Sequence, residues 1–271
     1  MSRGRLLAAL VVAAIALFSY FGSSVFNPIT EEKQHVAGIT PEQEVALGLQ
    51  AAPEMAQQFG GLDPSAEMQQ RVDRIGERLV TQSVAGQTPY RFEFHVLDDP
   101  QTINAFALPG GQIFITEGLL KRLTTDGQIA GVLGHEIAHV VARHGAEHIA
   151  KQQLTQGLTG AAVLATYDPS DPSSRNSAAV AAMIGQLVTM RFGRQDELES
   201  DRLGVRFTGE SGYDPRSLIA LMKILDESSE GNRPPEFFST HPNPENRIQR
   251  LEAAIREQYP NGLPQGLVAS R

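Results

Sequence analysis

The pattern of apolar and polar residues predicts a chain that is mostly helical. Apolar residues recur three or four positions apart in the segment that begins at Pro41, in residues 64–84 and in residues 127–144, which is the spacing of one helix face. Thr40 is a suitable N-cap for the first of these helices. Several separate helices are therefore expected, and their apolar faces need a common core.

A short sheet is predicted between the second and third helical segments. Residues 90–97 alternate between apolar and polar side chains, which is typical of a half-buried strand. Residues 103–108 and 112–116 flank Pro109-Gly110-Gly111, where proline followed by glycine suits a type II turn. We therefore expect a hairpin directly before the helix of residues 127–144.

The N-terminus has the pattern of a targeting segment. Arg3 and Arg5 precede an apolar run of sixteen residues from Leu6 to Phe21, or of twenty-one if the run extends to Phe26. The shorter run suits a signal-peptide core and the longer one a membrane anchor, with a buried core helix as a third reading. We favour an uncleaved anchor, and the two arginines then place the rest of the chain outside the cytoplasm.

Composition narrows the class of protein further. The net charge of −8 and the lack of basic clusters argue against nucleic-acid binding, and the absence of cysteine excludes a disulfide or a thiol nucleophile. Residues 157–167 and 178–190 are apolar but shorter than the ~20 residues of a membrane span. We expect them to form helices beside the functional site, joined by a mobile loop.

The sequence His135-Glu136-Ile137-Ala138-His139 carries the clearest chemistry. Two histidines four apart on a helix lie on one face, so both imidazoles can bind one metal ion. Glu136 can then reach a water at that ion, which is the arrangement used in metal-assisted peptide hydrolysis. A chance match in a chain of this size is on the order of one in a hundred, so the motif needs support from its surroundings.

The helix around this motif supports a metal site. With Asp126 as N-cap and Gly145 after its end, it has one broad apolar face, and small residues lie beside the two histidines. Buried histidines of this kind need a partner, which a metal would supply. His144 lies roughly 160° around the axis, so we interpret it as a helix-end histidine near the C-terminal dipole. His148 is given a structural role as well.

A third ligand is expected in residues 194–204. Glu197 and Asp201 are four apart and share a helix face, whereas Glu199 points about 200° away. One carboxylate can bind the metal while Asp201 accepts a hydrogen bond from a ligand histidine. The alternative is an acidic, solvated helix face, which is our interpretation of Glu199.

His241 is a candidate for a fourth role. It precedes Pro242 and so lies on a stiff, extended loop, before a helix that we expect to start with Asn243 as N-cap and Pro244 as first residue. Such a histidine can donate to the oxyanion of a tetrahedral intermediate or bind zinc as a reversible extra ligand. The alternative is a loop histidine bonded to backbone.

Taken together, these motifs resemble the zinc metallopeptidases that include the HtpX-type and CaaX-prenyl-protease-type enzymes. The resemblance covers roughly residues 40–257 and rests on Asn104 to Gly111, His135 to His139, Glu197 to Asp201 with Gly204, and Thr240-His241-Pro242 with Arg247. It implies that His135, His139 and Glu197 bind zinc, that Glu136 is the general base and that His241 lies at the active site. The chain lacks the several membrane spans and the helical repeats of some members.

These observations predict an α+β, mainly helical peptidase domain of the zincin type (gluzincin) with a small antiparallel sheet. We expect residues 1–26 to be a signal peptide or anchor, 27–60 a lead-in with the first helix, 61–260 the zinc metallopeptidase domain and 261–271 a tail. The edge of the hairpin can pair with an extended peptide, so we assign substrate binding to Asn104, Ala105 and Phe106.

The predicted function is a metalloendopeptidase with one Zn²⁺ per chain, which cleaves unfolded or damaged envelope proteins on the extracytoplasmic side. It would be membrane-anchored, or periplasmic or secreted if the N-terminal segment is removed. One rival is a zinc-stabilised chaperone or binding module in which His241 closes the metal site. A second rival is a membrane-anchored scaffold with a vestigial site.

Overall fold

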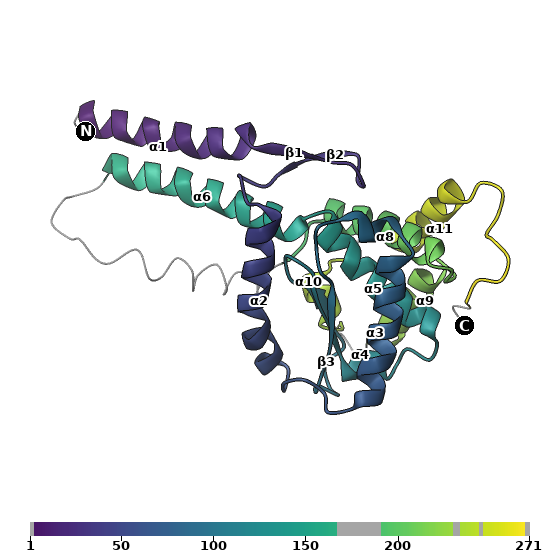
Figure 1. Cartoon of the computed structure of the whole chain (residues 1–271). Helices are drawn as coiled ribbons and strands as arrows, with labels where there is room; N and C mark the ends of the chain where they lie inside the picture. The colour runs from purple at the N-terminus through teal and green to yellow at the C-terminus, as the bar shows by residue number, and fades with distance from the viewer. Residues whose placement is uncertain (1–2, 167–190, 230–233, 244–245, 269–271) are drawn as a thin grey trace. The chain divides into compact units, whose positions relative to one another are not determined.

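The computed structural model describes residues 3–166, 191–229, 234–243 and 246–268. The chain divides into two compact units (Figure 1), one of residues 1–40 and 143–190 and the other of residues 41–142 and 191–271. We call the first the hairpin unit and the second, after the function that its sequence predicts, the catalytic unit. The predicted domain boundaries at residues 26, 60 and 260 remain a prediction.

The catalytic unit is mostly helical, and it carries the predicted motif. Its helices are α2 (Pro41–Gln58), α3 (Ala66–Thr81), η1 (Val84–Gln87), α4 (Glu117–Leu120), α5 (Asp126–Val141), α8 (Arg194–Glu210), α9 (Ser217–Glu227), α10 (Phe237–Thr240) and α11 (Arg247–Gln258). Every residue of α5 after the first is buried, so this helix forms the centre of the core. The predicted helix starts at Thr40 and near Pro64 agree with α2 and α3.

The sheet of the catalytic unit has three strands in the order β3-β5-β4, with bounds Glu93–Leu97, Gln112–Thr116 and Ala105–Ala107. The predicted hairpin is confirmed, since β4 and β5 pair in antiparallel fashion and Gly110 takes a φ of 84° in the turn. The sheet is nevertheless mixed, because β3 pairs with β5 in parallel. The segment that contains β4 is the crossover that a parallel pair requires. The α+β, mainly helical fold class is confirmed.

Helix α5 begins and ends earlier than the sequence predicted. Thr125, not Asp126, is the N-cap, and it forms a capping box with Gln128. The helix ends at Val141 because Arg143 adopts a left-handed φ of 58°. His144 is therefore the first residue of the next helix, so its interpretation as a histidine at the end of the metal helix is wrong.

Two further helix starts matter for the site. Helix α8 packs against α5, where a Cβ on Gly204 would lie 3.3 Å from the backbone nitrogen of His135. Helix α11 begins at Arg247, later than the predicted start at Pro244, and Asn246 before it has a left-handed φ of 62°. The close approach at Gly204 brings the backbone of α8 next to the first histidine of the motif.

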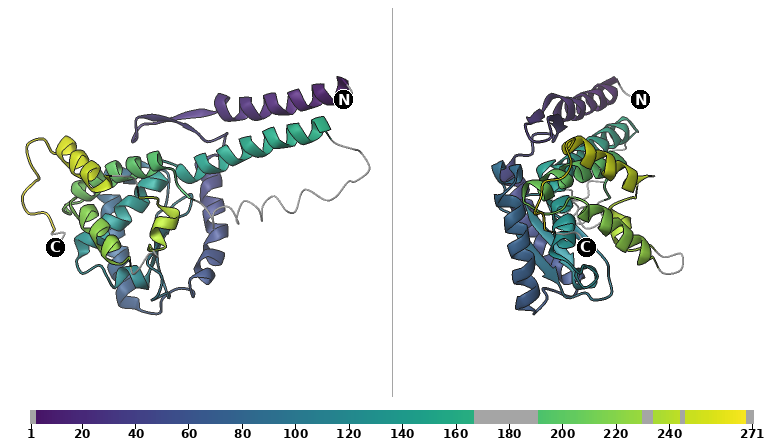
Figure 2. Two further views of the ribbon diagram at one scale, coloured as in Figure 1. Left: turned by 180° about the vertical axis from the view of Figure 1, so that it is seen from behind. Right: turned by 90° about the vertical axis from the view of Figure 1, so that its right-hand side faces the viewer.

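The hairpin unit contains α1 (Arg3–Gly22), α6 (His144–Thr166), and the antiparallel strands β1 (Ser24–Asn27) and β2 (Glu32–His35). Helix α1 ends at Gly22 and residues 24–27 pair as a strand, so the longer apolar run to Phe26 is not one continuous helix. Helices α1 and α6 lie side by side in both directions of view (Figure 2). The predicted loop and the apolar stretch 178–190 fall outside the described residues.

None of the helices in the described part of the chain is both long enough and apolar enough to cross a membrane.

Candidate metal centre

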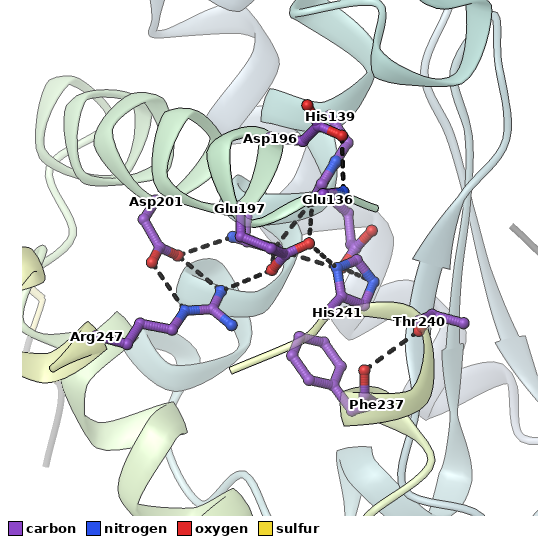
Figure 3. Close-up of polar contacts among 11 residues, drawn as sticks. Glu136, His139, Asp196, Glu197, Asp201, Phe237, Thr240, His241 and Arg247 are labelled. Carbon is purple, nitrogen blue, oxygen red and sulfur yellow. Dashed lines mark hydrogen bonds and ion pairs between the residues drawn. The ribbon is translucent and has the colours of Figure 1, made fainter. Parts of the chain in front are cut away.

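Four buried residues from three separate segments converge in the catalytic unit (Figure 3). His135 and His139 come from α5, Glu197 comes from the first turn of α8, and His241 follows α10. Each residue offers one ligand atom, and these four atoms all lie within 4.8 Å of one another. The i, i+4 spacing in α5 and the packing of α8 on α5 thus produce a compact set of three imidazoles and one carboxylate.

The distances within this cluster fit a tetrahedral zinc ion. Zinc bonds of about 2.0–2.1 Å give a tetrahedron with edges of roughly 3.3–3.4 Å. His135 Nε2 lies 3.1 Å from His139 Nε2 and 3.4 Å from His241 Nδ1. Glu197 Oε1 lies 3.0 Å from His241 Nδ1 and 3.5 Å from His139 Nε2. Nitrogen and oxygen donors at these separations are the ligand types that zinc takes in proteins.

Glu136 lies beside the cluster without being part of it. Its side chain is fully buried, and neither carboxylate oxygen has a hydrogen-bond partner among the residues that the structure describes. His241 Nε2 lies 3.6 Å from its Oε1. Burial raises the pKa of the Glu136 carboxyl above its ordinary value, which makes the carboxylate a better proton acceptor at neutral pH. A buried acceptor with no protein partner points to a ligand or solvent molecule at this place.

Asp201 and Arg247 form a second layer around the ligands. Asp201 Oδ1 is 3.1 Å from His135 Nδ1, and the Arg247 guanidinium donates to both Asp201 oxygens at 2.8 Å. Arg247 Nη2 also lies 3.2 Å from Glu197 Oε2. One buried arginine therefore fixes the ligand carboxylate and the carboxylate that orients a ligand histidine.

The charges of this network hold its two carboxylates, Glu197 and Asp201, ionised. Burial alone would raise the pKa of Glu197, but His241 and the two α5 histidines outweigh it and hold that pKa well below its ordinary value. Burial also opposes ionisation of Asp201, yet Arg247 and His135 lower its pKa. Burial would lower the pKa of His135, but hydrogen bonds to Asp201 and Glu197 raise it to about 9. The two buried carboxylates are thus compensated by Arg247 and by the histidines around them.

Two phenylalanines fix the histidine of the loop. The ring of Phe237 stacks on His241, with centroids 4.5 Å apart and planes 18° apart, and Phe192 lies 4.0 Å from the His139 ring. The Phe237 N–H donates to the Ile103 carbonyl, and the Phe192 N–H donates to the Thr240 carbonyl. The loop that carries His241 is therefore tied to the start of β4 and to the segment before α8.

The structure brings together all the residues to which the sequence gave a metal, catalytic or orienting role, namely His135, Glu136, His139, Glu197, Asp201 and His241. His144, His148 and Glu199 are not in the cluster. Asn104, Ala105 and Phe106, predicted to bind substrate, are buried as whole residues, with 2%, 0% and 7% exposed, so their role in substrate binding stays a prediction. The sequence analysis gave no role to Arg247, Phe192 or Phe237. For Arg247 the available signal was its position shortly after the Thr-His-Pro stretch, and no signal pointed to the two phenylalanines.

Comparison with known proteins places this arrangement in a family. The sequence model of Peptidase family M48 matches residues 66–255. The Beta-barrel assembly-enhancing protease of Escherichia coli is 35% identical over 202 residues, which are 70% of this chain and 39% of that protein. The Mitochondrial metalloendopeptidase OMA1 of Schizosaccharomyces pombe is 34% identical over 188 residues, 69% of this chain and 52% of that protein.

The chain thus spans about two fifths to one half of the length of these relatives. The match nevertheless includes every member of the buried cluster, from α5 through α8 to the loop of His241. The family model covers well over half of the sequence, and we conclude that this chain belongs to Peptidase family M48.

Proposed function

We propose that this protein is a zinc-dependent metalloendopeptidase with one Zn²⁺ per chain. His135, His139 and Glu197 would hold the ion, and Glu136 would be the general base. The observation that carries the proposal is the buried Glu136 carboxylate, which has no hydrogen-bond partner in the described part of the chain and lies beside four convergent ligand atoms. A metal-activated water is the partner that this carboxylate needs.

Zinc bound in this cluster would polarise the scissile carbonyl and lower the pKa of water at the site toward ~7. Glu136 then takes a proton from the attacking water and delivers it to the leaving amine. Asp201 keeps the Nδ1 proton of His135 on the far side of the ring, so that Nε2 faces the other ligands. Arg247 contacts the carboxylates of both Glu197 and Asp201 and so fixes their positions relative to each other.

His241 would have two roles, depending on the state of its loop. With Nδ1 3.0 Å from Glu197 Oε1, it is placed to be a fourth ligand that closes the site. Every group of the cluster is buried in this state, so a substrate needs the loop to move first. After that movement the imidazole, aided by its neighbour Phe237, can donate to the developing oxyanion.

We propose unfolded or damaged proteins of the cell envelope as substrates. One relative is named for β-barrel assembly and the other for the mitochondrion, and neither name points to the cytosol. An extended peptide chain could pair with the edge of β4, the outer strand of the sheet, through the backbone of residues 104–106 once the segments that now bury these residues have moved. We place the enzyme outside the cytoplasm, with residues 1–26 as an anchor or a removed signal peptide.

The test is metal analysis combined with cleavage of a protease-free unfolded protein. The purified full chain should contain one zinc per molecule and should cleave the unfolded protein. A chelator should abolish cleavage, and stoichiometric zinc should restore it. A chain that holds zinc but cleaves nothing, under conditions that restore the metal, would overturn the peptidase proposal.

A second candidate, a zinc-stabilised chaperone or binding module, is favoured by one observation. The cluster has four buried protein ligands rather than three, and a closed set of four is typical of structural zinc. The variant His241→Ala separates the two functions. A structural site should lose zinc and melt at a lower temperature, whereas a peptidase closed by His241 should keep zinc and change its cleavage rate.

A further inference from the structure

Helix α1 of the hairpin unit has its large and small residues on unexpected sides. The residues that are buried or half-buried follow one stripe at helical spacing and include three alanines, Ala9, Ala13 and Ala16, with Val12 and Tyr20. Most of the outward residues are large and apolar, with Ala8, Ala14 and Ser19 among them: Leu6, Leu7, Leu10, Val11, Ile15, Leu17, Phe18 and Phe21 have exposed fractions of 42% to 79%. The inward stripe is thus rich in alanine, and eight large apolar side chains lie outside.

The small residues are explained by the contact with α6. A Cβ on Gly157 would lie only 2.7 Å from the Cβ of Ala16, so the two helices approach closely at this point. In water such a pair would turn its leucines and phenylalanines inward, because burial of each is worth about 1.5–3 kcal/mol. Helix pairs in lipid show the observed arrangement, with small residues at the interface and large apolar residues toward the acyl chains.

In both helices the side chains change from polar to apolar at the same height along the pair. They run side by side, with the N-terminal end of α1 next to the C-terminal end of α6 (Figures 1 and 2). Helix α6 exposes polar residues from Lys151 to Gln156, while the sequence from Gly157 to Ala165 has Thr159 as its one polar side chain. Helix α1 has no polar side chain from Leu6 to Phe18, and Gly157 marks the level because it contacts Ala16.

Aromatic residues lie near this level on α1. Phe18 and Phe21 are exposed by 79% and 60%, and Tyr20 stacks on His35 of β2 at 5.2 Å. Aromatic side chains are enriched where a membrane meets water. The apolar part of α1, Leu6 to Leu17, is roughly 18 Å long at 1.5 Å per residue, compared with ~30 Å for the hydrocarbon of a bilayer.

We propose that α1 and α6 form a lipid-binding hairpin whose apolar end inserts into the hydrocarbon of a bilayer. Phe18 and Phe21 would lie at the interface, and the polar stretch 151–156 of α6 would stay in water. The inference rests on the extracytoplasmic, membrane-side location in the proposed function, but it does not depend on peptidase activity.

The absence of cysteine from the sequence makes this inference directly testable. In the full chain with Glu136→Gln, Leu10→Cys and Gln153→Cys would be labelled separately with a polarity-sensitive fluorophore. Vesicles of phosphatidylcholine, with and without phosphatidylglycerol, would carry lipids with a quencher on the acyl chain. The probe at residue 10 should shift to the blue and be quenched in both kinds of vesicle, while the probe at residue 153 stays unchanged.

A second pair of variants tests the hairpin itself. Ala16→Cys with Gly157→Cys should form a disulfide under mild oxidation, and the crosslinked protein should still float with vesicles. Leu10→Cys with Gln153→Cys is the control pair and should not crosslink. Loss of flotation on crosslinking would mean that α1 inserts without α6 and would overturn the hairpin.

Two other results would also overturn the proposal. One is a protein that does not float with either vesicle type. The other is a stable dimer in which the residue 10 probe shifts to the blue before lipid is added, since a second copy would then cover the outward face. All these readouts use an inactive variant, so failure of the peptidase proposal would leave them interpretable.

Discussion

The helix pairs α5–α8 and α1–α6 both approach closely at a glycine, but they differ in whether the large apolar residues around the contact are buried or exposed. In each pair a glycine permits close approach, Gly204 against the backbone of His135 and Gly157 against Ala16. Around the first pair, large apolar residues such as Leu133 and Ile137 are completely buried. Around the second pair, the large residues of α1 are exposed.

This difference separates two uses of a close helix contact. In the catalytic unit the contact brings a carboxylate of α8 to the histidines of α5 inside a core, where low polarity strengthens electrostatic interactions. In the hairpin unit the small residues of α1 form the contact, so its large apolar residues lie on the outside. Close packing thus serves metal chemistry in one unit and, by our proposal, attachment to lipid in the other.

The largest effect is expected from Glu136→Gln, which keeps the shape of the buried side chain but removes the proton acceptor. Zinc content should stay at one per chain, and cleavage of an unfolded protein should fall by about 10²–10⁴-fold, the usual contribution of a general base. Glu199→Gln, on α8 and outside the metal cluster, is the matched control and should retain its rate. Near-normal cleavage by Glu136→Gln would remove Glu136 from the mechanism.

The next effect is expected from Arg247→Lys. Lysine cannot reproduce the two parallel hydrogen bonds to Asp201, so the orientation of His135 and Glu197 should loosen. We expect zinc affinity to fall by about 10–100-fold, as for other outer partners of metal ligands. Competition with a fluorescent zinc chelator would measure this loss.

Arg250→Lys on the exposed side of the same helix is the control for this change. Its zinc affinity should equal that of the unaltered chain. If both arginine variants bind zinc equally well, the contacts of Arg247 with the two carboxylates do not position the ligands.

A third prediction compares the two glycines directly. Gly204→Val adds methyl groups against the backbone of His135 and the side chain of Leu218, and overpacking of this kind costs about 1–3 kcal/mol. The gain in helix propensity, below about 1 kcal/mol, is smaller. Hydrogen exchange followed by mass spectrometry should show weaker protection of the α5 amides.

Gly157→Val is the counterpart in the hairpin unit. It should leave protection of α5 unchanged within about 0.5 kcal/mol and should instead raise exchange in α1 and α6. The same loss of α5 protection in both variants would contradict the independence of the two helix pairs.

The parts of the site that sequence predicted are those set by local geometry. His135 and His139 share a face because they are four apart, and the same periodicity selects Glu197 and Asp201 while excluding Glu199. Helical phase therefore grouped the two histidines of α5 and the two carboxylates of α8, and the family resemblance implied that Glu197 is the metal ligand. The hairpin of β4 and β5 was predictable for a similar reason, since Pro109-Gly110 specifies its turn.

The parts that sequence missed depend on contacts between distant segments. Arg247 and Asp201 are 46 positions apart in the sequence, so no local sequence pattern predicts their contact. The end of α5 was placed too late, because an arginine in the left-handed region is rare and Gly145 offered a more usual stop. The sequence of α1 alone does not tell which of its residues face another helix, because this depends on where α6 packs.

The smallest effect is expected from Leu10→Ala in the lipid-free protein. Leu10 is 59% exposed, so its truncation should leave the free energy of unfolding within about 0.5 kcal/mol of the unaltered chain. Leu133→Ala is the matched change in α5, where the side chain is completely buried, and should cost about 2–5 kcal/mol. Urea unfolding, with exchange protection read separately for α1 and α5, distinguishes the two. A similar cost at both leucines would show that the outward face of α1 is packed against protein in solution, and the contrast between the two helix pairs would then disappear.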